Sequence, residues 1–174
     1  MFHADECGVC LLPFCAKTWA PKGQTPVLKE LKSREHLNLF GMISTRGDLC
    51  WQIQRHPFKA EDFEEFFTWL NTEGMPNIKL LVVWDGASIH KGQPVKNFLQ
   101  NNPGLIHLEA LPPYCPQLNA IELLWDYLKC HKLKNRIFLN LDDLQAAVEH
   151  TLNEIADDPE LIRSFFTKSS VVFL

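Results

Sequence analysis

The sequence has no run of apolar residues approaching the ~20 that a membrane-spanning helix needs. Its first residues, Met1–Glu6, lack the basic stretch followed by an apolar one that marks a secretory signal peptide. Internal repeats, low-complexity tracts and an obvious linker are also missing. We therefore expect residues 1–174 to form one domain without membrane contact, in the cytosol, the default compartment of an untargeted chain.

The six cysteines lack any regular spacing. A chain of 174 residues buries enough surface to fold without disulfides, so we interpret the cysteines as free thiols in a reducing compartment. Cys7 and Cys10 form half of a zinc-ribbon pattern, for which Cys130 and His131 are a weak second half. The favoured interpretation is that these cysteines are small apolar residues, with a structural zinc as the alternative.

The chain also lacks the excess of basic residues that a simple DNA-coating protein carries, because its net charge is −4. Its basic residues are concentrated in Lys17–Arg34 and Lys129–Arg136. An acidic chain with such segments can still present a basic face to nucleic acid.

Hydrophobic periodicity and turn residues predict alternating strands and helices. Strands are expected at Phe2–Ala4, Gly8–Phe14, His36–Thr45, Leu49–Gln54, Lys79–Trp84 and Leu105–Leu111. Helices are expected at Ala60–Asn71, Gly92–Asn101, Ile121–His131, Leu141–Ile155 and Glu160–Phe166. This order predicts an α/β fold of three layers, with a mixed central sheet flanked by helices.

Three acidic residues lie at the ends or starts of the predicted strands and helices. Asp85 ends the most hydrophobic predicted strand, where α/β folds place their sites, although a turn aspartate before Gly86 is an equal alternative. Asp5 is expected at the end of the first strand, where the common alternative is a surface turn acid. Glu6 could replace Asp5 but should point to the opposite face of the strand.

Glu122 opens an amphipathic helix after a proline-rich loop. An acid in the first turn usually interacts with the helix dipole, and Asp126, one turn later on the same face, could take the place of Glu122. If the fold brings Asp5, Asp85 and Glu122 together, their hard oxygen ligands suit magnesium or manganese. Two such ions can clamp the attacking and leaving oxygens of a phosphodiester.

Three segments of the sequence carry a family resemblance. They are Asp5-Glu6 followed by Thr18–Pro26, the segment Trp84–Lys91 (WDGASIHK), and Leu111–Trp125 (LPPYCPQLNAIELLW). The chain thereby resembles the catalytic domain of mariner-type DDE transposases, in their bacterial insertion-sequence branch, from its first residues to about Phe166. Thirty-six residues separate Asp85 from Glu122, close to the family's spacing.

The resemblance implies an RNase H-like fold in which Asp5, Asp85 and Glu122 hold two divalent ions, Mg²⁺ or Mn²⁺. The chain departs from the family's pattern at Gly86, Cys115 and Ala120, where Asn, Ser and Pro are common. Family members also carry helix-turn-helix modules before the catalytic domain, whereas this sequence starts almost at Asp5. The chain is therefore expected to be a fragment, a separately encoded half or a decayed copy.

Several further residues are candidates for DNA contact, each with an ordinary structural alternative. Trp19 and Lys22 lie in an expected loop that could equally be solvated. His90 follows Asp85 closely and could touch phosphate, although a packing or capping histidine is the more common arrangement. The basic residues after the Glu122 helix could hold the phosphate backbone or simply complement the helix end; they are Lys129, Lys132, Lys134 and Arg136.

The resemblance predicts metal-dependent cleavage and strand transfer of DNA in cut-and-paste transposition. The expected partners are transposon ends and target DNA, a second copy of the chain in a homodimer or synaptic complex, and a separately encoded DNA-binding half. DNA-bound protein would lie at the bacterial nucleoid. The alternatives are a catalytically silent remnant that only binds DNA or protein, and a structure-specific nuclease of the same fold.

Overall fold

The computed structural model describes residues 1–15, 17–24, 27, 33–76 and 78–168. Part of the basic segment Lys17–Arg34, at residues 25, 26 and 28–32, lies outside the described residues. In the part of the chain that the structure describes, every helix is too short or too polar to cross a lipid bilayer.

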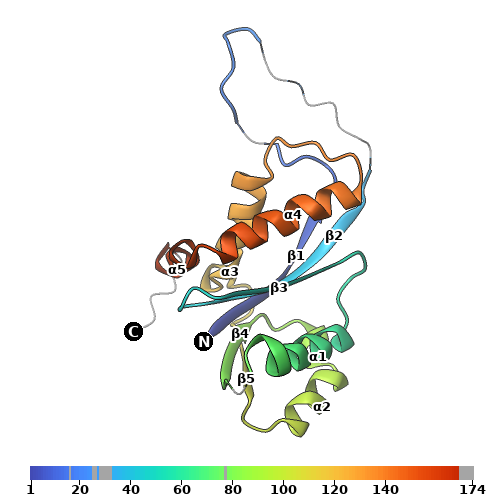
Figure 1. Cartoon of the computed structure of the whole chain (residues 1–174), viewed down its shortest axis with the longest axis vertical. Helices are drawn as coiled ribbons and strands as arrows, with labels where there is room; N and C mark the ends of the chain where they lie inside the picture. The colour runs from blue at the N-terminus through green and yellow to red at the C-terminus, as the bar shows by residue number, and fades with distance from the viewer. Residues whose placement is uncertain (16, 25–26, 28–32, 77, 169–174) are drawn as a thin grey trace.

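A mixed five-stranded sheet forms the centre of the molecule (Figure 1). Its spatial order is β3-β2-β1-β4-β5, with antiparallel pairing from β3 to β1 and parallel pairing from β1 to β5. The strands are β1 Phe2–Cys10, β2 His36–Ser44, β3 Leu49–Gln54, β4 Leu80–Trp84 and β5 Ile106–Ala110. Gly47, with φ of 95°, forms the turn of the predicted hairpin β2-β3.

The first strand differs from the prediction. Phe2–Ala4 and Gly8–Phe14 are not separate strands, because β1 runs unbroken from Phe2 to Cys10 and pairs with β2 along its whole length. Asp5 therefore lies in the middle of a strand and not at its end. The acidic pair Asp5-Glu6 after a short apolar segment suggests a strand end in the sequence, but in the structure only the pairing with β4 ends nearby, at His3.

Helices cover both faces of the sheet, which makes three layers (Figure 1). One face carries α1 and α2; the other carries α3, α4 and α5. The helices are α1 Ala60–Trp69, α2 Gln93–Asn101, α3 Ile121–Tyr127, α4 Leu141–Ala156 and α5 Pro159–Lys168. A π-helical turn extends α1 to Gly74 and another extends α3 to Lys132, and 3-10 turns form at Ser88–Lys91 and Pro116–Leu118.

The alternation of side chains along β1 and β2 divides the core into two clusters. Phe2 and Ala4 face the aromatic side chains of α1, while Cys7 and Val9 face α3 and α4. Every second residue of a strand points to the same face, so each face collects its own set of apolar side chains. The helices on that face then bury them. This confirms the α/β architecture with a mixed sheet and fixes which acidic side chains can meet.

Candidate active site

The sheet register relates Asp5 in β1 to Asp85, which directly follows β4. The parallel pairing of β1 with β4 sets Phe2 beside Val82 and His3 beside Val83. Continuing this register by two residues brings Asp5 beside Asp85, immediately after the last residue of β4. The carboxyl edge of the parallel strands is where α/β sheets place their ligands.

Two hydrogen bonds dock the start of α3 on β1, next to Asp5. Asn119 Nδ2 donates to the Ala4 carbonyl oxygen at 3.0 Å, and the Ala120 N–H donates to His3 Nδ1 at 3.0 Å. Burial lowers the pKa of His3 to about 4, so the ring is neutral and can accept this bond. Glu122 follows two residues after Ala120 and is held at the same edge.

A glycine in β2 allows α3 to approach the sheet closely. Gly41 pairs with Asp5 across β1 and β2. A Cβ atom on Gly41 would lie 2.7 Å from the Trp125 ring, closer than van der Waals contact allows. The missing side chain thus leaves room for Trp125, which is one turn after Glu122 on the buried face of α3.

The three predicted carboxylates line one cavity of about 370 Å³. The proline-rich loop after β5 lines the same cavity, with Tyr114 almost fully exposed at φ 59°. The lining residues are Asp5, Asp85, Gly86, Ala87, Leu111, Pro112, Pro113, Tyr114, Cys115, Pro116, Asn119 and Glu122. The fold therefore gathers at one site three acids from three separate elements.

Negative charge is concentrated in this cavity. Burial raises the pKa of Asp5 to about 8, and the charges of Glu122, Glu6 and Asp85 add to the effect. Burial also raises the pKa of Glu122, with Asp126 adding to the rise, while a hydrogen bond with Asp5 opposes it. Without a cation, these raised pKa values favour a proton shared between the carboxyls of Asp5 and Glu122.

The donor set fits a divalent cation. Carboxylate oxygens on rigid elements are the ligands that Mg²⁺ and Mn²⁺ prefer, and a cation would relieve the repulsion that raises the pKa of Asp5. Asp5, Asp85 and Glu122 are the residues that could hold it.

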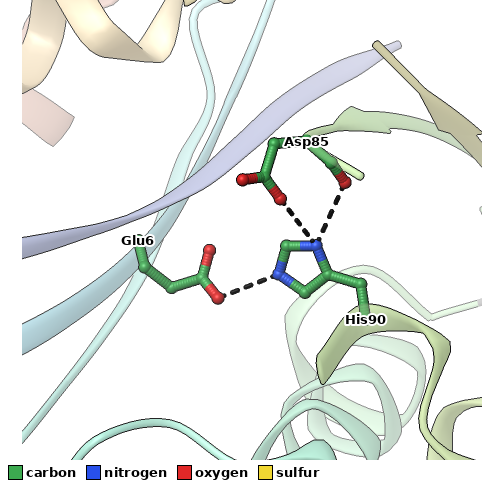
Figure 2. Close-up of side chains that lie close together, drawn as sticks. All are labelled: Glu6, Asp85 and His90. Atoms are coloured by element: carbon green, nitrogen blue, oxygen red, sulfur yellow. Dashed lines mark hydrogen bonds and ion pairs between the residues drawn. The ribbon is translucent and has the colours of Figure 1, made fainter. Parts of the chain in front are cut away.

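A second group shares Asp85 with this cavity (Figure 2). His90 Nε2 lies 2.8 Å from Glu6 Oε1, and His90 Nδ1 lies 3.0 Å from Asp85 Oδ1 and 3.2 Å from the Asp85 carbonyl oxygen. Burial lowers the pKa of His90, but the hydrogen bond and charge of Glu6 and the contacts with Asp85 outweigh it and hold that pKa above its ordinary value.

The sequence did not reveal the pairing of Glu6 with His90. Glu6 does point to the face opposite Asp5, towards α1, as strand alternation predicted. His90 is buried, so in this structure its ring has no surface from which to contact DNA. The sequence shows a histidine shortly after Asp85, but this does not indicate that the histidine bonds to Glu6, 84 residues away.

The other predicted DNA-contact residues lie at the surface or beside the cavity. Trp19 is fully exposed and Lys22 is exposed, both in the segment after β1. Lys129 lies close enough to Glu122 to lower the pKa of that carboxyl. Lys132 pairs with Glu154 at 3.0 Å, Arg136 lies over the Phe138 ring, and Lys134 is exposed.

The six cysteines are free, as expected. Cys7 is buried and Cys10 exposed, since positions three apart on a strand face opposite sides. Burial raises the pKa of the Cys7 thiol to about 11. Among the described residues, the one group of potential ligand atoms within 4.8 Å of one another consists of Glu6, Asp85 and His90, without a cysteine.

A mixed sheet with helices on both faces and carboxylates gathered at one edge is the arrangement of RNase H-like nuclease domains. Residues 1–145 match the model of a family described as DDE superfamily endonuclease. This chain belongs to that family.

Solved structures share the fold. The Mos1 transposase paired-end complex with left transposon end superposes with a TM-score of 0.74 at 16% identity, over 96% of this chain and 51% of that one. The Mos1 mariner paired end complex with Mn gives a TM-score of 0.70 at 14% identity, over 96% and 51% of the two chains. The fold is therefore RNase H-like, as the resemblance implied.

One curated protein is similar over a shorter stretch. It is "Uncharacterized protein y4pE/y4sA" of Sinorhizobium fredii (strain NBRC 101917 / NGR234), with 37% identity over 62 residues. The match covers 36% of this chain and 46% of that protein. The chain thus spans about half the length of the relatives that it matches.

Proposed function

We propose that residues 1–174 form the single catalytic domain of a cut-and-paste DNA transposase. The observation that carries the proposal is the gathering of Asp5 in β1, Asp85 directly after β4 and Glu122 in α3 around one cavity. The membership of the DDE endonuclease family and the fold shared with a transposase bound to its transposon end support the same conclusion.

In the proposed mechanism, Asp5, Asp85 and Glu122 hold two divalent ions, Mg²⁺ or Mn²⁺. When bound, these ions supply Lewis-acid stabilisation of the attacking and leaving oxygens in an in-line displacement at phosphorus. A similar fold has been solved in a mariner complex with Mn, which supports this choice of ion.

The reaction has two displacements. In the first, a water oxygen forms a bond to phosphorus while the bond to the 3′-oxygen breaks, which leaves a 3′-hydroxyl and a 5′-phosphate. In the second, that 3′-hydroxyl attacks a phosphodiester of target DNA and displaces a new 3′-oxygen. The three carboxylates would hold the ions that bind the phosphate, and the proline-rich loop lines the same cavity.

We propose that DNA reaches the cavity along the basic residues that follow α3. Lys129 is close enough to Glu122 to lower the pKa of that carboxyl, and it would meet a phosphate next to the scissile one. Lys134 and Arg136 are exposed and would contact phosphates further along the DNA. Lys132 contributes less, because Glu154 already pairs with it. Trp19 and Lys22 are proposed to contact DNA from the segment after β1.

The assembly extends beyond this chain in our proposal. The partners are transposon ends and target DNA, a second copy in a dimeric synaptic complex, and a helix-turn-helix module, separately encoded or otherwise supplied, that reads the end sequence. The chain would act in the bacterial cytoplasm, at the nucleoid while bound to DNA.

The experiment that tests this proposal is nicking of supercoiled plasmid by the purified chain. Nicking should occur with magnesium or manganese and stop when EDTA removes the metal, because the three carboxylates cannot stabilise the transition-state charge alone. A folded protein that binds DNA but nicks in neither metal would instead support the catalytically silent remnant.

A further inference from the structure

One oxygen of the Asp85 carboxylate is held by two donors. Asp85 Oδ1 accepts a hydrogen bond from the Ala87 N–H at 3.0 Å and lies 3.0 Å from His90 Nδ1. The same ring nitrogen lies 3.2 Å from the Asp85 carbonyl oxygen, which can only accept, so Nδ1 carries a proton and donates. Figure 2 shows one carboxylate oxygen turned to the ring and the other turned away from it.

The His90 ring is itself fixed from several sides. It stacks on Trp84 with ring centroids 3.9 Å apart and an interplanar angle of 9°, and the Phe63 ring meets it edge-on. Glu6 Oε1 lies 2.8 Å from Nε2, on the side of the ring away from Asp85 (Figure 2). Only 1% of the His90 side chain is exposed, so its packing and its hydrogen bonds together prevent the ring from turning.

We propose that Glu6 and His90 form a positioning pair that orients Asp85 for metal binding. This inference rests on the proposed function, in which Asp85 is a metal ligand. Glu6 fixes the ring, the ring and the Ala87 N–H fix one carboxylate oxygen, and the other oxygen is presented to the cavity that Asp5 and Glu122 share. Hydrogen-bond partners of metal ligands set ligand orientation, and their loss costs about 10–100-fold in metal affinity or activity.

The same three residues could in principle hold an ion, because their ligand atoms lie within 4.8 Å of one another. Both ring nitrogens, however, already face hydrogen-bond partners, and Nδ1 faces a backbone carbonyl that needs its proton. A metal on His90 would have to replace these bonds. The geometry therefore favours positioning, and direct ligation by His90 is an outcome that the experiment must detect.

The test compares manganese binding by the whole chain and its variants, using titration calorimetry. Glu6→Ala and His90→Ala should raise the manganese dissociation constant by at least about tenfold. Glu6→Gln keeps an acceptor for Nε2 and His90→Asn keeps an N–H donor near Nδ1, so each should recover part of the loss. His107→Ala, at an exposed histidine on β5, is the matched control and should bind as the wild type does.

Two further measurements separate positioning from general damage. In the nicking assay, Glu6→Ala should need more manganese for its half-maximal rate, whereas loss of folded protein would lower the maximal rate and leave the metal dependence unchanged. Thermal melts without metal identify any variant that fails to fold. Substitution of Glu6 should disturb folding less than substitution of His90, because the Glu6 side chain is 24% exposed and is not part of the aromatic packing.

Wild-type affinity for manganese in Glu6→Ala would overturn the positioning pair. So would anomalous diffraction that places manganese within bonding distance of a His90 ring nitrogen, since this would show that manganese binds the ring directly. A wild-type chain that binds no manganese would instead refute the proposed function, and the inference with it. Because the wild type is titrated in the same series, the two failures are distinguishable.

Discussion

Glu122→Gln should lose metal-dependent plasmid nicking by at least about 1000-fold, equivalent to about 4 kcal/mol of transition-state stabilisation. The change replaces a charged carboxylate by a neutral amide of the same shape, so the docking of α3 through Asn119 and Ala120 is retained. Affinity for DNA should remain close to that of the wild type, because the phosphate contacts come from basic residues. The measurement is the rate of nicking with manganese at saturating DNA.

The matched control is Asp126→Asn on the same helix. Asp126 is exposed and does not line the cavity, although its charge raises the pKa of Glu122. It should therefore change nicking by no more than a few fold. If Asp126→Asn abolished nicking and Glu122→Gln did not, the assignment of the third acid would move to Asp126.

Asp5→Asn should stabilise the metal-free protein at alkaline pH and remove its response to magnesium. The pKa of Asp5 in the folded protein is about 8, above its ordinary value of 3.8, chiefly because the side chain is buried. The folded state therefore favours the protonated carboxyl, and that stability is present below about pH 4 and lost as the pH rises through about 8. An asparagine carries no such penalty at any pH.

Thermal melts of both proteins at pH 5 and pH 9 measure this effect. At pH 9 without metal, Asp5→Asn should melt at least about 3 °C above the wild type, the shift that ~1 kcal/mol produces in a domain of this size. At pH 5 the difference should be smaller, because less of the penalty on the ionised carboxyl has developed there. Magnesium at pH 9 should raise the wild-type melting temperature and leave Asp5→Asn unchanged, while Asp126→Asn should respond as the wild type does. A full magnesium shift in Asp5→Asn would remove Asp5 from the ligand set.

The sequence predicted those parts of the site that depend on local pattern. Asp85 was predicted at the end of a buried strand because the apolar run Leu80–Trp84 stops there, and the structure confirms the strand. The helix that begins at Ile121 was evident from its spacing of apolar residues and from the prolines before it. The antiparallel hairpin β2-β3 was equally local, since its turn contains Gly47.

Contacts between distant elements could not be predicted from the sequence. The position of Asp5 within β1 depends on the pairing of β1 with β2 along its whole length, which is a property of the assembled sheet. The pairing of Glu6 with His90 joins residues 84 positions apart, and the bond from Asn119 to the Ala4 carbonyl oxygen joins residues 115 positions apart. Nothing in the local composition of either partner identifies the other.

In the proposed function, Asp5, Asp85 and Glu122 together form a metal-dependent phosphodiester-cleaving site. The most direct test is anomalous diffraction from crystals of the chain grown with manganese and a DNA duplex. Two manganese peaks are expected about 4 Å apart, in contact with oxygens of these three carboxylates and of a phosphate. Manganese bound by Glu6 and His90, or no manganese at the three carboxylates, would contradict the proposed function.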